Sequence, residues 1–203
     1  MDPALVALAA RTRGFMPEAE GLALRQAALD LGVPGPILEV GSYCGLSAIY
    51  LGDAARTGGR LLFSVDHHRG SEENQVGWLH HDADLVDPSS GRMDTLPFFR
   101  ETIVAAGLEG TVVAVVGESV AVAGAWSPGL AMLFIDGGHA EAVAMADYRA
   151  WAPRVLAGGV LAIHDVFLDP AAGGQAPYLV FQRAVADGFT AIGGTGSLRL
   201  LRR

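Results

Sequence analysis

The chain has 203 residues, the length of one ordinary domain, and no apolar run reaches the about 18 residues that a membrane-spanning helix needs. Its formal net charge is −8, and its 14 basic residues are all arginines scattered along the chain, which argues against a nucleic-acid-binding surface. The single cysteine cannot form an internal disulfide, which favours a reducing, cytoplasmic location.

Residues 1–36 are expected to form helices that precede the sheet and serve as a lid. Asp2 followed by Pro3 is typical of a helix start, because aspartate caps free backbone amides and proline suits the first turn. A second helix is predicted over residues 18–28. Its inward-facing side chains are expected to be Leu22, Leu24 and Ala28.

Short apolar runs then alternate with longer helical patterns. The runs that predict strands are 37–40, 61–66, 111–116, 130–136 and 159–165. The patterns that predict helices between them are 46–55, 95–107 and 140–156, and the last two are expected to end at Gly107 and in the region of Pro153. The tail "FTAIGGTGSLRLLRR" predicts two strands around a glycine-rich turn. This order predicts one α/β domain over 1–203, a doubly wound and mostly parallel sheet that ends in an antiparallel hairpin.

A polar segment over 67–94 interrupts this alternation. It follows the second predicted strand, on the edge where such sheets bind ligands, and a loop of this length is more often functional than idle. Its histidine pairs, 67–68 and 80–81, do not have the spacing of a structural zinc site, and no cysteine accompanies them.

Small residues follow the first strand in "ILEVGSYCGLSAIYLG". Gly41 allows a sharp turn, and Gly45 allows close approach to the backbone. A dinucleotide fold needs a further glycine where Tyr43 stands, so a diphosphate would meet a side chain. Asp66, which closes the second strand, is placed to accept both hydroxyls of a ribose. Together these residues favour a nucleoside ligand without phosphate.

Four segments resemble a known family. "LEVGSYCGLSA", "VVGESVAV", "LFIDGGH" and "GGVLAIHDV" are similar to motifs of class I S-adenosylmethionine-dependent O-methyltransferases of the catechol O-methyltransferase type, over about residues 37–166. The pair "FIDGGH" and "HD" resembles the bacterial branch that methylates sugars and natural products. "VDHHRGSEENQ" is similar to the mannoside 1-O-methyltransferases of methylmannose polysaccharide synthesis.

The resemblance implies a seven-stranded Rossmann-like sheet, S-adenosylmethionine as methyl donor and a hydroxyl group of a small molecule as acceptor. The implied cofactor-binding residues are Glu39, Gly41, Ser42, Tyr43, Gly45, Ser47, Asp66, His67, Glu118, Ser119 and Asp136. The implied substrate-binding residues are His68, Glu72, Glu73, Asn74 and Trp78. Met16 and Glu20 are lid candidates. For Glu118 and Ser119 an ordinary turn with a helix cap is the alternative.

The chain has no lysine, although the catechol type uses one as the base three residues after the strand-ending aspartate. His139 holds that position and is predicted to be the general base beside Asp136; a helix-capping role is the alternative. The resemblance also implies a divalent cation, Mg²⁺ or another, on Asp136, His164 and Asp165. Alternatively, these carboxylates only close strands.

Two other functions stay open at this point: a nicotinamide-dependent oxidoreductase, and a methyltransferase-like module that binds cofactor without catalysis. Binding of S-adenosylhomocysteine (SAH) or of NAD distinguishes the first of these from a methyltransferase. The acidic balance disfavours nucleic-acid and coenzyme-A substrates, and the polar loop favours a saccharide acceptor. The apolar helix over 177–185 either forms a homodimer contact or packs on the sheet.

Overall fold

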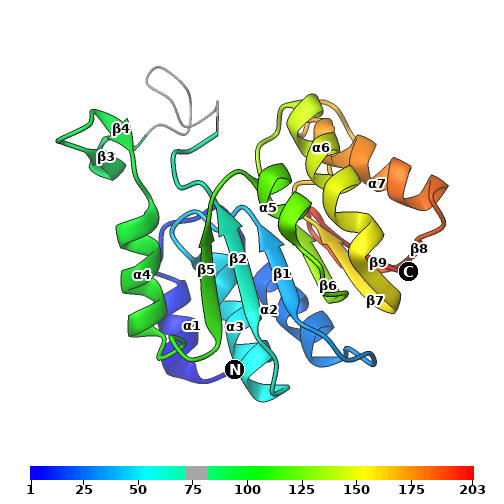
Figure 1. The fold of residues 1–203 in the computed structure, drawn as a ribbon, viewed down its shortest axis with the longest axis horizontal. Coiled ribbons are helices and arrows are strands. Elements are labelled where there is room, and N and C mark those ends of the chain that lie inside the picture. Colours follow the sequence, from blue (N-terminus) through cyan, green and yellow to red (C-terminus); the bar gives the residue numbers. More distant parts are fainter. Residues whose placement is uncertain (72–81) are drawn as a thin grey trace.

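The computed structural model describes residues 1–71 and 82–203. Seven strands form one sheet in the order β5-β2-β1-β6-β7-β9-β8 (Figure 1). These strands are β1 (Ile37–Val40), β2 (Leu62–Asp66), β5 (Val112–Val116), β6 (Leu130–Ile135), β7 (Val155–Ile163), β8 (Thr190–Thr195) and β9 (Leu198–Arg202). The first five are parallel, and β9 is antiparallel to both β7 and β8. The predicted sheet with its terminal hairpin is therefore confirmed.

Helices cover both faces of this sheet. The helices on one face are α1 (Pro3–Ala9), α2 (Glu18–Leu29), α3 (Leu46–Thr57) and α4 (Leu96–Ala105). Those on the other face are α5 (Ser119–Ala125), α6 (Glu141–Trp151) and α7 (Ala176–Ala186). Because both faces are covered, every residue of β1 and β6 is buried, which explains why these strands read as unbroken apolar runs.

The parallel strands end at one edge of the sheet, and the following loops therefore meet there. β1 pairs in register with both β2 and β6 over its whole length. The loops after β1, β2, β5, β6 and β7 consequently lie close together although they come from distant parts of the chain. This carboxyl edge is the expected ligand-binding edge of a doubly wound sheet.

The helix predicted from residue 140 ends in the region of Pro153, as expected. α6 stops at Trp151, and a short 3₁₀ turn leads into β7 at Val155, which pairs with Leu130. Pro153 lies in this turn and has no backbone N–H to continue the helix. β7 thus begins earlier than predicted, and it ends at Ile163, which leaves His164 and Asp165 just beyond the strand.

Part of the polar segment after β2 is folded. A two-stranded ladder joins β3 (Val86–Asp87) to β4 (Arg92–Met93), and Figure 1 shows this hairpin projecting away from the main sheet. Leu85 and Met93 are buried against Cys44 in a small separate core. The hairpin is therefore held by its own apolar contacts with the loop that follows β1.

Asp2 caps α1 as predicted: its Oδ1 accepts a hydrogen bond from the Ala4 amide at 2.8 Å. On α2, Leu24 and Ala28 are buried, but the prediction for Leu22 is wrong because it is exposed.

α7 packs on α6 and buries Val180. A homodimer contact through α7 stays a prediction. In the described residues, no helix has the length and apolar character to cross a membrane.

Candidate active site

A cleft of about 1180 Å³ lies at the carboxyl edge of the sheet. It is larger than the roughly 300–1,000 Å³ of a typical ligand pocket, so it has room for two small molecules. The predicted site residues that line it are Gly41, Ser42, Tyr43, Ser47, Asp66, His67, Glu118, Ser119, Asp136, His139, His164 and Asp165. The topology therefore brings together residues that the sequence separates by more than a hundred positions.

The loop between β1 and α3 requires glycine at two positions, each with positive φ. Gly41 has φ 88°, and a Cβ there would lie 2.2 Å from the carbonyl oxygen of Asp136. Gly45 has φ 92°, but its nearest neighbours are Phe99 and Thr102 of α4, and it is absent from the cleft lining. Gly41 thus brings the loop against the end of β6, whereas Gly45 lets it approach α4.

The Asp66 carboxylate holds this loop in place. Its Oδ2 accepts hydrogen bonds from the backbone amides of Ser42 and Tyr43, at 2.9 Å and 2.8 Å. Its Oδ1 accepts one from the amide of His68 at 2.7 Å. A carboxylate has about four acceptor positions, so Asp66 keeps acceptor capacity toward the cleft that it lines.

Glu39 lies behind the loop and is completely buried, outside the cleft lining. Ser64 donates a hydrogen bond to it at 2.5 Å, and Ser47 donates one at 2.9 Å. Burial raises the pKa of Glu39 to about 7, against the opposing effect of these hydroxyls. Any effect of Glu39 on a bound ligand would therefore act through Ser47, which does line the cleft.

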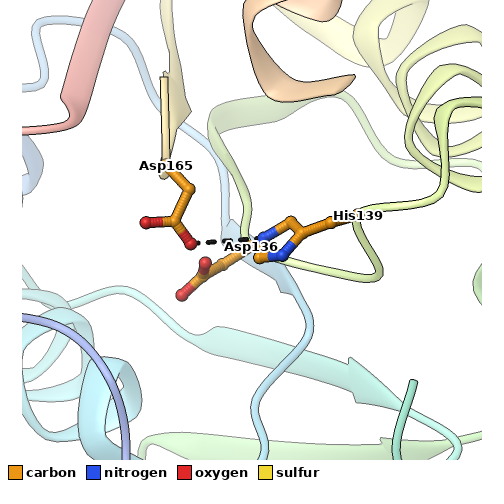
Figure 2. A group of neighbouring side chains, drawn as sticks. All are labelled: Asp136, His139 and Asp165. Carbon is orange, nitrogen blue, oxygen red and sulfur yellow. Dashed lines mark ion pairs between the residues drawn. The ribbon is translucent and has the colours of Figure 1, made fainter. Parts of the chain in front are cut away.

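At the ends of β6 and β7 lies an acid–histidine cluster, which consists of Asp136, His139, His164 and Asp165. His139 Nε2 lies 3.2 Å from Asp165 Oδ2, and Figure 2 shows the imidazole ring directed toward the two aspartates. Burial alone would raise the pKa of Asp165, but hydrogen bonds from both histidines hold it well below its ordinary value. Asp165 also has φ 55°, a left-handed conformation that is uncommon outside glycine and often occurs at functional sites.

His164 is buried beneath this pair, and carboxylates face both of its ring nitrogens. Nδ1 lies 3.0 Å from Asp136 Oδ1 and 3.4 Å from Asp165 Oδ2, while Nε2 lies 2.6 Å from Glu20 Oε2. Burial alone would lower the pKa of His164, but the charges of Asp136 and Asp165 raise it to about 11. Because carboxylates can only accept, both ring nitrogens of His164 are placed to donate a hydrogen bond.

This arrangement changes the set of residues that could hold a metal ion. The predicted set contained His164, whose nitrogens are both engaged by carboxylates and cannot also bind a cation. Asp136, His139 and Asp165 instead offer ligand atoms that all lie within 4.8 Å of one another. Two carboxylates and one imidazole fit a divalent cation, with His139 in place of His164.

Glu118 and Ser119 lie where β5 passes into α5, at another wall of the cleft. Trp151 Nε1 donates a hydrogen bond to Ser119 Oγ at 2.8 Å. Asp147 of α6, which the sequence analysis missed, also lines this wall and is buried. Burial raises its pKa, against the effect of a side-chain hydrogen bond with Ser119. Asp147 lies inside a regular helical pattern, so nothing in the neighbouring sequence distinguishes it from an exposed aspartate.

The neighbouring histidines differ in position. His67 lines the cleft, whereas His68 is buried, with its Nδ1 2.8 Å from Thr95 Oγ1. Burial lowers the pKa of His68 and keeps its ring neutral. Contact with a substrate would require His68 to leave this position. The other predicted substrate-binding residues, Glu72, Glu73, Asn74 and Trp78, lie outside the described residues, as do His80 and His81.

Cys44, in the same loop, is buried, and burial raises its pKa to about 12, so it is unsuited to be a nucleophile. Ser42 Oγ, by contrast, is a buried hydroxyl in the cleft lining that has no hydrogen-bond partner among the described residues. A buried polar atom of this kind is normally satisfied by a bound molecule or water.

The family profile described as "Methyltransferase domain" matches residues 38–166, which is more than half of the chain. The chain belongs to this methyltransferase family. The match begins in β1 and ends just after Asp165, so it spans the glycine loop, Asp66 and the acid–histidine cluster. The methyltransferase family had been predicted from these segments, and that prediction is confirmed.

Solved structures of similar fold include two O-methyltransferases and one cofactor-bound protein. The O-methyltransferase NovP has 18% identity and a TM-score of 0.67, with 89% of this chain and 78% of that chain covered. Cofactor-bound Rv0187 from MTB has 19% identity and a TM-score of 0.69, with 100% and 90% covered. The O-methyltransferase from Bacillus cereus in complex with SAH has 17% identity and a TM-score of 0.67, with 100% and 92% covered. At these identities the likeness concerns the fold.

Proposed function

We propose that this methyltransferase moves the methyl group of S-adenosylmethionine to a hydroxyl group of a small, polyhydroxylated acceptor, with His139 as the general base. The observation that carries the proposal is the 3.2 Å contact between His139 and Asp165, in the same cleft as the glycine loop and Asp66. One cleft thus contains both the wall that we propose for the nucleoside and a histidine paired with an aspartate.

The cofactor would lie along the donor end of the cleft, by which we mean the glycine loop over 41–47 together with Asp66. Its sulfonium supplies an electrophilic methyl group, so the protein has only to bind it and to direct the acceptor. Ser42 Oγ, unpartnered among the described residues, and the remaining acceptor positions of Asp66 fit the polar groups of such a nucleoside. Glu118 and Ser119 would border its base.

His139 would remove the acceptor proton. Because Asp165 can only accept, the hydrogen on His139 Nε2 points to it, which leaves Nδ1 as the basic nitrogen. Asp165 fixes the ring orientation and stabilises the imidazolium that forms when the proton is taken. Its low pKa keeps it ionised throughout the neutral range.

A cation-assisted route is the second candidate, favoured by the three ligand atoms on Asp136, His139 and Asp165. Bound there, a divalent ion would lower the pKa of the acceptor hydroxyl. One nitrogen of His139 cannot both bind the ion and accept the proton. Activity measured after a chelator has removed the metal therefore distinguishes the two routes. Activity that is lost with a chelator and restored by Mg²⁺ or Mn²⁺ supports the cation; activity unchanged after metal removal supports His139 alone.

For the acceptor we propose a saccharide, in particular a mannoside of methylmannose polysaccharide synthesis. Among the described residues that line the cleft, Arg13 is the one arginine, and it is ion-paired with Asp82 and Asp84. The cleft therefore offers little to a phosphorylated acceptor such as coenzyme A. Labelled methyl transfer, screened over short mannosides, other glycosides and catechols, tests this: labelling of catechols alone would contradict a saccharide acceptor.

A further inference from the structure

Glu20 lies in the first turn of α2, far in sequence from the motifs of the active site, and its side chain is buried. Oε2 accepts a hydrogen bond from His164 Nε2 at 2.6 Å, and Oε1 accepts one from the Ser197 amide at 2.8 Å. The carboxylate therefore joins three segments: α2, the end of β7 and the turn between β8 and β9.

The same carboxylate is one end of a chain of contacts that reaches the reacting groups. His164 Nδ1 lies 3.0 Å from Asp136 and 3.4 Å from Asp165, and Asp165 in turn lies 3.2 Å from His139. Each of these groups is held by the next, so the orientation of the His164 ring determines where both aspartates sit.

The surroundings of Glu20 show that a carboxylate is needed. A Cβ on Gly196 would lie 2.1 Å from Glu20 Oε1, so the turn leaves space for that oxygen at its glycine. His164 Nε2 and the Ser197 amide both present hydrogens to Glu20. Glutamine has one side-chain oxygen and could accept from only one of the two, and its NH₂ group would face the other donor.

We propose that Glu20 is a positioning residue for methyl transfer: it fixes the His164 ring and thereby holds Asp136 and Asp165 in place for His139. The inference rests on the proposed function. This role makes α2 a part of the active site as well as a cover for the sheet. A carboxylate buried solely for packing would lower the stability of the fold with nothing to compensate for it.

The test compares Glu20→Gln with Glu18→Gln, a variant on the same helix whose side chain is exposed. The measurements are kcat and KM for labelled methyl transfer to a short mannoside, SAH affinity by calorimetry, melting temperature, and the downfield proton resonance of His164 Nε2–H. We expect Glu20→Gln to lower kcat about 10- to 100-fold, with SAH affinity within about twofold and the resonance lost. Glu18→Gln should match the wild type in all four.

Several results would overturn the role of Glu20. One is a Glu20→Gln variant that keeps its kcat or its His164 resonance. Another is a parallel loss of kcat, SAH affinity and melting temperature, which would mean that Glu20 only supports the fold. A wild-type protein that neither binds SAH nor transfers methyl groups would refute the proposed function, and the positioning role with it. Wild-type activity with an unaffected Glu20→Gln variant would refute the role of Glu20 alone.

Discussion

The two ends of the cleft are built in different ways. At the donor end, Asp66 holds the amides of Ser42 and Tyr43 through contacts between residues about 24 positions apart. At the acid–histidine cluster, His164 is held by Glu20 from 144 positions away, and Glu20 by Ser197 from 177 positions away. The donor end is thus one local supersecondary unit, whereas the cluster depends on α2 and the final hairpin being in place.

This difference separates binding from chemistry. Substitutions at the donor end should affect cofactor affinity and the fold of the β1 loop. Substitutions in the cluster should affect turnover and leave cofactor affinity almost unchanged. Single substitutions at the two ends of the cleft test that separation.

Replacement of the base should have the largest effect. In His139→Ala we expect turnover to fall by about 10²- to 10⁴-fold, the usual contribution of a general base. SAH affinity should change by less than about twofold, since His139 lies in the acid–histidine cluster, 3.2 Å from Asp165, and outside the donor end of the cleft. Single-turnover rates and SAH calorimetry check this. A variant that keeps its turnover would show that His139 is not the base.

Gly41→Ala should destabilise the fold by several kcal/mol, because its Cβ would lie 2.2 Å from the Asp136 carbonyl oxygen. Gly59→Ala is the matched control, since Gly59 also has positive φ but has no neighbour within 4 Å. We expect the control to lose only about 1–2 kcal/mol, the cost of the left-handed conformation. Equal losses in chemical denaturation would contradict the close packing of the β1 loop on β6.

Asp66→Asn should weaken SAH binding by about 10- to 100-fold, since hydrogen bonds to a charged group are worth roughly 1.5–3 kcal/mol each. Calorimetry measures this, and Asp30→Asn at the exposed end of α2 is the control. If Asp66→Asn instead leaves SAH affinity intact and lowers turnover alone, the two ends of the cleft are not separable.

Glu39 should make stability depend on pH. Its pKa in the folded protein, about 7, lies above the ordinary value of 4.5 because burial disfavours the charged form, so the folded state is most stable at low pH, where Glu39 is protonated. That stability is lost as the pH rises from 4.5 to about 7, on the order of 3 kcal/mol for a shift of this size. In Glu39→Gln this part of the pH dependence should vanish. Parallel pH profiles of the free energy of unfolding for the two proteins would contradict a buried, titrating Glu39.

The sequence predicted the sheet, and it indicated that Gly41 and Asp66 lie at one edge of that sheet, because both rest on local patterns. The apolar runs gave the parallel strands, and Gly41 and Asp66 indicated a ligand loop from their places after β1 and β2. The end of α6 was predicted near Pro153, because proline has no backbone N–H to continue a helix. The β3–β4 hairpin was not predicted, because its strands are only two residues each.

The sequence indicated the residues of the acid–histidine cluster but not the contacts between them. Asp136, His139 and Asp165 were expected to lie together, whereas His164 was assigned to a metal. Its engagement by Glu20 depends on α2 packing against the β8–β9 hairpin, and no local pattern near residue 20 indicates that. A glutamate in a helix indicates a functional role only when its burial and its hydrogen-bond partner are known, and both come from the structure.

The central claim is that the donor end binds an adenosyl compound and not a dinucleotide. Calorimetric titration of the wild-type protein with SAH and, separately, with NAD tests it most directly. The account predicts saturable binding of SAH at one site per chain and no heat from NAD. Binding of NAD without binding of SAH would contradict it.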